Sequence, residues 1–386
     1  MASGIDREGV FWLAGEASGD FIASLVMPQV RDALGGALCY GIGGPKMAAE
    51  GFRAWHDISE LSVRGYVEVL QHLPRLWRLR RSLAQRISDS LPRAFIGVDA
   101  PDFNLGLETE LRRRRIPVIH MVSPSIWAWR PERIQTIRRA VDHMLLLFPF
   151  EAKIYRRAGI AATFVGHPLA GIIPMQPQTE AARAELGVQP EGRPVLCVMP
   201  GSRKSELAGC GAIFFEAVSR LIKRAGAMEV LIPVVSDEAK VAVQQQLAAH
   251  PTVLEHAHIV VGASHRMIEA SDAVLVASGT AALECALYKK PMVVGYRMPG
   301  LTGLLMEKKG LIDCVSLPNI LLGEKVVPEF LQFFCEPDQI SWALEDALQN
   351  DAKRAQLIER FSELHTSLMA DTAGLTAEVV ARLAKS

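Results

Sequence analysis

The feature that most constrains the fold is an alternation of short apolar runs with helical patterns, which occurs twice along the chain. In the first half the apolar runs lie at 9–15, 37–44, 94–100, 117–123 and 143–150. Strands that alternate with helices are typical of a parallel sheet in a doubly wound α/β domain. The alternation restarts after residue 194, and helical sequence follows from about residue 330 to the end.

A proline-rich stretch separates the two halves. Residues 166–194 contain five prolines and little strand pattern, and 386 residues exceed the usual size of one domain. We expect a Rossmann-like domain over 1–170, a second over 190–340 and C-terminal helices over 341–386. Ligands of such sheets bind beyond the carboxyl ends of the strands, so we expect the two domains to face a cleft.

Composition limits the functional classes. The 42 basic and 42 acidic residues balance, which disfavours nucleic acid as a partner. None of the six cysteines forms a C-x-x-C pair, so we expect buried, reduced thiols rather than zinc or disulfides. The N-terminus lacks the apolar segment of a signal peptide, and no apolar run approaches the ~18 residues that cross a bilayer. These features predict a cytoplasmic protein, which could still lie on a membrane surface.

Two loops in the second half are suited to anions. In "SGTAALE" the hydroxyls of Ser278 and Thr280 flank Gly279 at the start of a helix, where free amides attract phosphate. Glu284, one turn later, could accept hydrogen bonds from a ribose diol. The alternative is a capped helix that packs on the sheet.

The loop "PGSR" follows an apolar run directly. Gly201 permits a sharp turn, Ser202 follows it, and the guanidinium of Arg203 can hold a phosphate through two hydrogen bonds. The alternative is a solvated surface loop. Two such loops at the strand ends of one domain favour a diphosphate ligand.

Carboxylates follow the apolar runs of the first half. Glu16 and Asp20 lie in "AGEASGD", where they suit a hydroxyl-rich substrate or proton transfer, although Asp20 is more readily explained as the cap of the following helix. Asp99, in "GVDAPDFN", is a candidate general base, and Asp102 could begin a helix. The spacing is too weak to predict a metal site.

Aromatic and basic residues form two further clusters. Trp127 and Trp129 lie in a proline-bounded loop, where they could contact a sugar or an acyl chain, or simply belong to the core. The stretch 69–87 alternates leucine and tryptophan with arginine. That pattern fits a helix at a membrane interface and equally a solvated helix docked on the sheet.

Ten motifs in order resemble one family. They are AGEASGD, GIGGPKM, GVDAPDFN, SPSIWAWR, PFE, VGHPL, PGSR, SGTAALE, PMVVGYR and SLPN. Over about residues 10–380 the chain resembles the lipid-A-disaccharide synthases, which form glycosyltransferase family 19. Met121 and Met199 replace the more usual tyrosine and leucine.

The resemblance implies the GT-B fold, with an N-terminal acceptor-binding domain and a C-terminal domain that binds the UDP-sugar. It implies an inverting transfer from UDP-2,3-diacylglucosamine to 2,3-diacylglucosamine 1-phosphate (lipid X), which gives UDP and a β-1,6-linked lipid A disaccharide 1-phosphate. Asp99 and Arg203 match essential residues of the family, and Glu16 and Asn319 match further polar positions of its active site. We expect Asp99 to be the base, with Glu16 in reserve.

We expect no cofactor and no metal, because the loops at the cleft lack the familiar Asp-x-Asp metal motif and the chain offers no convincing set of ligands. The resemblance also implies a location on the inner face of the cytoplasmic membrane of a Gram-negative cell. The sequence does not decide whether the protein forms a homodimer. Two alternative functions also stay open: a UDP-N-acetylglucosamine 2-epimerase, which shares the fold but needs no acyl site, and a non-catalytic nucleotide-sugar-binding protein, which would not need Asp99.

Overall fold

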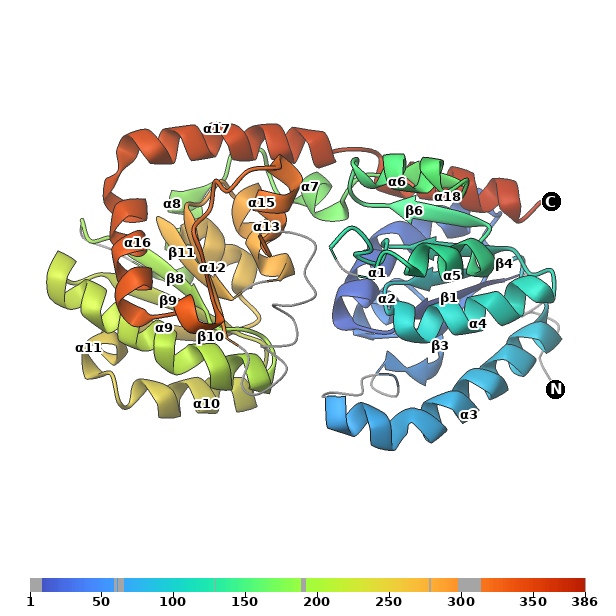
Figure 1. Ribbon diagram of the computed structural model, residues 1–386, viewed down its shortest axis with the longest axis horizontal. Helices are drawn as coiled ribbons and strands as arrows, with labels where there is room; N and C mark the ends of the chain where they lie inside the picture. Colours follow the sequence, from blue (N-terminus) through green and yellow to red (C-terminus); the bar gives the residue numbers. More distant parts are fainter. Residues whose placement is uncertain are drawn as a thin grey trace. The chain divides into compact units, whose positions relative to one another are not determined.

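The protein consists of two compact units (Figure 1). The computed structural model describes residues 9–58, 61, 66–128, 130–188, 192–277, 279–297 and 314–385. Unit 1 comprises Met1–Gly171 together with Leu368–Ser386, and unit 2 comprises Ile172–Ser367. Both units are parallel α/β structures, as the alternation of apolar and helical sequence predicts.

Unit 1 is built on a seven-stranded parallel sheet in the order β3-β2-β1-β4-β5-β6-β7 within the described residues. The strands are β1 (Val10–Ala14), β2 (Cys39–Gly43), β3 (Arg53–Asp57), β4 (Ala94–Val98), β5 (Val118–Met121), β6 (His143–Leu146) and β7 (Ala162–Phe164). The helices are α1 (Ala17–Ala33), α2 (Pro45–Ala49), α3 (Tyr66–Ser90), α4 (Pro101–Arg113), α5 (Arg133–Ala140), α6 (Glu151–Arg157), α7 (Pro168–Ile172) and α18 (Thr372–Leu383).

Helices cover both faces of this sheet. Along β1, Val10 and Trp12 belong to one apolar core, whereas Phe11 and Leu13 belong to a second. All four side chains are fully buried. A strand buried on both faces appears in the sequence as a continuous apolar run, which is why 9–15 could be recognised.

The C-terminal helix α18 completes unit 1. Ala377, Val379 and Val380 join the core formed by α1 and by one face of the sheet. The loop after β7 also contacts this returning segment, since the amide of His167 donates to the carbonyl of Leu368 over 2.9 Å. The last residues of the chain therefore belong to the same fold as the first.

Unit 2 has a six-stranded parallel sheet in the order β10-β9-β8-β11-β12-β13 in the described part of the chain. The strands are β8 (Val195–Met199), β9 (Glu229–Val234), β10 (Ala257–Val261), β11 (Ala273–Ala277), β12 (Met292–Tyr296) and β13 (Glu329–Leu331). The helices are α8 (Thr179–Leu186), α9 (Lys204–Ala225), α10 (Asp237–Leu247), α11 (Pro251–Leu254), α12 (Ser264–Ala270), α13 (Thr280–Leu287), α15 (Leu317–Leu322), η3 (Gln332–Phe334), α16 (Pro337–Gln349) and α17 (Asp351–Leu368).

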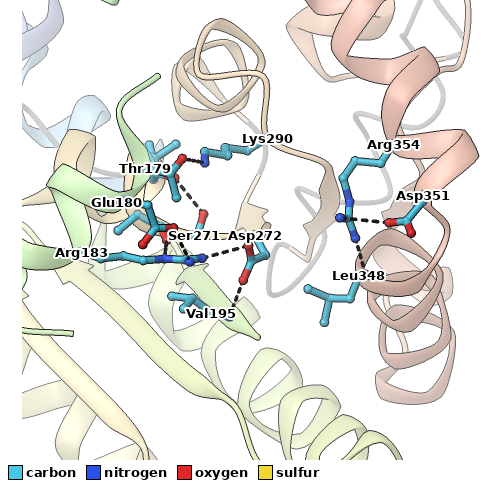
Figure 2. A network of polar contacts seen from close by, with 12 residues as sticks. Thr179, Glu180, Arg183, Val195, Ser271, Asp272, Lys290, Leu348, Asp351 and Arg354 are labelled. Carbon is cyan, nitrogen blue, oxygen red and sulfur yellow. Dashed lines mark hydrogen bonds and ion pairs between the residues drawn. The ribbon is translucent and has the colours of Figure 1, made fainter. Parts of the chain in front are cut away.

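A polar network secures the amino ends of the central strands of unit 2 (Figure 2). The carboxylate of Asp272, just before β11, accepts hydrogen bonds from the first amide of β8, at Val195, over 2.8 Å and from Arg183 of α8 over 2.9 Å. The ammonium of Lys290 donates to Thr179 at the start of α8 over 2.8 Å. These contacts bind α8 to the amino ends of the strands. The candidate binding loops leave the opposite, carboxyl ends of the same strands.

None of the described helices combines the length and the apolar character needed to cross a bilayer.

Candidate functional site

Glu16 and Asp99 follow neighbouring strands of unit 1. Ala14, at the end of β1, pairs with Val98 at the end of β4. The strand order reverses between β1 and β4, which is where open α/β sheets bind ligands. The Ser18 hydroxyl lies 3.5 Å from a carboxylate oxygen of Asp99. The structure therefore places Glu16 and Asp99 at the carboxyl ends of two adjacent strands of one sheet.

The backbone at Asp99 has an unusual conformation. Asp99 has φ 55° and Ala100 has φ 45°, so two consecutive non-glycine residues are left-handed. Such residues cost about 1–3 kcal/mol each and persist only where their surroundings hold them. The side chain of Asn104 donates to the Asp99 carbonyl over 2.7 Å. A Cβ on Gly15 would lie 2.5 Å from Cβ of Ala100, so the glycine lets the two loops meet.

The expectation that Asp20 caps the following helix is wrong. Helix α1 begins at Ala17, and Asp20 lies inside its first turn with 2% exposure. Its carboxylate instead accepts the amides of Gly44 (2.8 Å), Lys46 (3.1 Å) and Met47 (3.1 Å). Asp20 is therefore the cap of α2, a contact across 24–27 residues that local sequence does not reveal.

Two buried acidic residues of unit 1 were not singled out from the sequence. Glu108 of α4 contacts His120 of β5, with 2.6 Å between Oε1 and Nδ1, and both residues are fully buried. Glu151, at the start of α6, accepts a hydrogen bond from the indole of Trp127 over 3.1 Å. Burial raises the pKa of Glu151 to about 7, even though the bond from Trp127 opposes the rise. Trp129 lies outside the described residues.

In unit 2 the "PGSR" loop is organised by a residue that was not predicted. Oε2 of Glu206 accepts the amides of Ser202 (3.0 Å) and Arg203 (3.2 Å), and its Oε1 contacts the guanidinium of Arg203 at 2.9 Å. Gly201 has φ 116°, and a Cβ there would lie 2.4 Å from Glu206. The Arg203 side chain is nevertheless 61% exposed. The guanidinium is thus presented to solvent, while Glu206 occupies two of the loop amides.

The "SGTAALE" loop lies beside this one. Met199 of β8 pairs with Val276 of β11, so the loops that follow leave the same edge of the sheet, again where the strand order reverses. Gly279 is the N-cap of α13, and among the described residues a Cβ there would meet nothing within 4 Å. Thr280 is also exposed, whereas Ser278 lies outside the described residues.

Glu284 faces a histidine that sequence reasoning missed. The Glu284 carboxylate lies 3.4 Å from Nε2 of His265 on α12 and is 18% exposed. His265 in turn packs edge-on against Tyr288. Glu284 is therefore partly accessible one turn into α13, as its predicted contact with a ribose requires.

Asn319 has a different environment. It is fully buried in α15, and its amide nitrogen donates to the carbonyl of Val327 and to Glu329. Its amide oxygen accepts the amide of Val327. These bonds fix α15 to β13, so in this conformation the Asn319 side chain is fully engaged with protein groups.

Two parallel α/β units with polar strand-end loops at each strand-order reversal form the GT-B glycosyltransferase fold. Solved structures support this class. One is the UDP-GlcNAc 2-epimerase from Neisseria meningitidis bound to UDP-GlcNAc, with a TM-score of 0.65 and 12% identity, covering 98% of this chain and 99% of that chain. Another is MurG from Acinetobacter baumannii, with a TM-score of 0.57 and 12% identity, covering 97% and 99%.

Sequence relatives narrow the class to one family. The profile described as LpxB, lipid-A-disaccharide synthetase, matches residues 10–380. The lipid-A-disaccharide synthase of Cupriavidus pinatubonensis is 47% identical over 381 residues, which cover 98% of this chain and 94% of that protein. The corresponding protein of Burkholderia pseudomallei is 45% identical over 375 residues, covering 97% and 96%.

The chain belongs to the lipid-A-disaccharide synthase family. It is a hexosyltransferase with a glycosyltransferase role in lipid A biosynthesis, and the family resemblance drawn from the ten motifs is confirmed.

Proposed function

We propose that the protein transfers 2,3-diacylglucosamine from UDP to the 6-hydroxyl of 2,3-diacylglucosamine 1-phosphate, with inversion at the anomeric carbon. The observation that carries the proposal is the pairing of polar loops at both strand-order reversals, with carboxylates in unit 1 and anion-binding groups in unit 2. Unit 1 then binds the acceptor, and unit 2 binds the UDP-sugar.

In the reaction, the acceptor oxygen forms a bond to the anomeric carbon while the bond from that carbon to the UDP phosphate oxygen breaks. The hydroxyl proton passes to Asp99, which is half-buried at the end of β4. Glu16 is the alternative base. The leaving UDP gains one negative charge, which Arg203 and the amides at the start of α13 stabilise. Glu284 binds the ribose.

Gly201, Ser202, Ser278, Gly279, Thr280 and Asn319 complete the proposed UDP site. For Asn319 the support is indirect, since its amide is engaged with Val327 and Glu329. A contribution of Asn319 to UDP binding would therefore act through the position of α15.

We also propose that the reaction uses no metal ion and takes place on the inner face of the cytoplasmic membrane. In the described ranges, no group of three or more His, Cys, Asp or Glu side chains could hold a metal ion. Both substrates carry acyl chains, which gives the protein a reason to lie on a lipid surface.

The experiment that tests the proposal is turnover of radiolabelled UDP-diacylglucosamine with lipid X in detergent, with and without EDTA. The expected products are UDP and a labelled disaccharide in both conditions. Epimerised sugar without disaccharide would indicate the 2-epimerase, and binding without turnover would indicate a nucleotide-sugar-binding protein. Activity that EDTA abolishes and Mg²⁺ restores would contradict the metal-free mechanism.

A further inference from the structure

Three buried polar side chains surround a glycine in the middle of unit 1. Gly97 of β4 pairs with His120 of β5. A Cβ on Gly97 would lie 2.1 Å from Oε1 of Glu108 and 3.3 Å from the amide nitrogen of Asn104. Asn104, Glu108 and His120 are all fully buried. The absence of a side chain at Gly97 thus makes the room that these three residues occupy.

Burying this polar cluster in an apolar core costs free energy of folding. Neighbouring side chains, including Phe95, Leu105 and Leu107, belong to an apolar core. Burial disfavours a charged His120, but attraction to Glu108, with a smaller contribution from Asp99, raises the pKa of His120 above its usual value. Buried ion pairs are often no more stabilising than apolar residues of the same size. Stability alone is therefore a weak explanation for the Glu108–His120 pair.

The cluster is linked to the strained turn above it. Asn104 donates to the carbonyl of Asp99 over 2.7 Å, and the amide of Asp99 donates to the carbonyl of Met121 over 3.0 Å. Val122, which follows β5, is also left-handed, with φ 75°. The strained backbone of Asp99 is thus held from α4 on one side and from the end of β5 on the other.

We propose that Asn104, Glu108 and His120 are positioning residues that hold Asp99 in its left-handed conformation and direct its carboxylate toward the acceptor hydroxyl. Asn104 does so through the Asp99 carbonyl. The Glu108–His120 pair fixes α4 against β5 and holds the His120 ring in place on the strand that neighbours β4, which leads to Asp99. The inference rests on the proposed role of Asp99 as the base.

A double-mutant cycle on kcat tests this inference. Asn104→Ala removes the bond to the Asp99 carbonyl and is expected to lower kcat about 10- to 100-fold, because small displacements of a reacting group are that costly. The KM for the UDP-sugar should change little. In the Asp99→Asn background, Asn104→Ala should cause no further loss, since it acts through Asp99.

A matched control and a second variant complete the cycle. Thr109→Ala, on the same helix, removes only a bond to the carbonyl of Leu105 and should leave kcat unchanged. Glu108→Gln keeps the size of Glu108 but removes its charge. It should lower the titration midpoint of His120 measured by NMR, and it should lower kcat in the wild-type background only.

The outcomes separate the two proposals. Ordinary kcat in Asp99→Asn would overturn the base assignment and the positioning role together. If Asp99→Asn keeps a strongly lowered but measurable kcat, and Asn104→Ala or Glu108→Gln causes the same further loss in both backgrounds, only the positioning role is overturned. Unchanged kcat in the single variants Asn104→Ala and Glu108→Gln would also overturn the positioning role alone.

Discussion

At the scale of single residues, Arg203 presents a side chain that is 61% exposed at the strand ends of unit 2. Arg203→Ala is expected to lower kcat/KM by about 10²–10³-fold, the range found when a donor to a developing negative charge is removed. Arg203→Lys should restore part of this, because the charge stays but two parallel hydrogen bonds are lost. The neighbouring exposed Lys204→Ala is the control. Steady-state kinetics would contradict the role if Arg203→Ala matched Lys204→Ala.

Glu151 gives a prediction about pH. Its pKa is raised from 4.5 to about 7 in the folded protein, mainly by burial. The folded state therefore holds the proton more tightly than the unfolded chain, and the free energy of unfolding should fall as pH rises from about 4.5 to about 7. The free energy of unfolding of Glu151→Gln, measured relative to wild type, should therefore rise by up to about 3 kcal/mol across this pH range.

Urea unfolding of both proteins at pH 5 and pH 8 measures this gain. Glu132→Gln, at an exposed position, controls for the loss of one charge. A wild-type to Glu151→Gln difference that stays constant between the two pH values would show that Glu151 ionises as freely in the folded protein as in the unfolded one.

The sequence located the polar residues of the strand-end loops better than those that lie inside helices. Asp99 and Arg203 stand directly after apolar runs, so their place at a sheet edge follows from local order. Glu108 and Glu206 lie inside helices α4 and α9, where an acidic residue usually faces solvent. Their roles depend on which strand or loop the helix packs against, and that information is not local.

At the scale of elements, Asp20 joins α1 to α2. Asp20→Ala leaves the amides of Gly44, Lys46 and Met47 without their acceptor and is expected to lower the free energy of unfolding by about 1–3 kcal/mol. Asp20→Asn keeps one acceptor oxygen and should lose less. Urea unfolding measures both, and an Asp20→Ala protein as stable as wild type would mean that water replaces the carboxylate.

Helix α3 gives the prediction about the membrane. Leu83, Ala84 and Ile87 pack into the core, whereas Trp77 is 53% exposed with the guanidinium of Arg81 5.5 Å from its ring centre. The second half of α3 is therefore docked, as one of the two alternatives predicts. Its outer face still carries an aromatic and basic surface.

Replacing Arg78 and Arg81 by glutamate should weaken binding to vesicles that contain phosphatidylglycerol, and high salt should weaken wild-type binding similarly. Arg80 is left unchanged because its guanidinium lies against Gly106 of α4. Glutamate at Arg156 and Arg157, which are exposed on α6, is the matched charge control. Vesicle sedimentation measures the binding. If both double variants lose the same amount of binding, α3 does not form a specific membrane-binding surface.

Most of the strands that the sequence predicts are buried on both faces, although the edge strand β10 is not. The apolar runs at 9–15 and 94–100 became β1 and β4, and helix patterns between runs became α1 and α4. Strands β3, β7 and β13 were missed, because β7 and β13 have only three residues and all three are mostly half-buried or exposed. A short strand at a sheet edge has neither a long apolar run nor a strict alternation.

At the scale of the whole molecule, unit 1 is made from both ends of the chain. A chain that ends at Ser367 lacks α18 and leaves the apolar surface of α1 uncovered. We expect amide hydrogen exchange to accelerate in α1 but not in α9, which belongs to unit 2. Removal of Lys385 and Ser386 alone is the control. Unchanged exchange in α1 of the shorter chain would show that α18 contributes little to unit 1.

Gly166 shows how tightly the returning segment fits. It has φ 83°, and a Cβ there would lie 2.7 Å from the Ala370 side chain and 2.9 Å from the Leu368 carbonyl. The glycine of "VGHPL" therefore lets the loop after β7 pack closely against the segment that leads into α18.

This arrangement sets an order of events during synthesis. The first 171 residues leave the ribosome early, but α18 emerges only after the whole of unit 2, a delay of roughly 10–40 s at ~5–20 residues per second. During that interval unit 1 exposes the apolar face of α1 to chaperones and proteases. A chain broken off before α18 would stay in that state, because Ala377, Val379 and Val380 would be missing from the core that α1 helps to form.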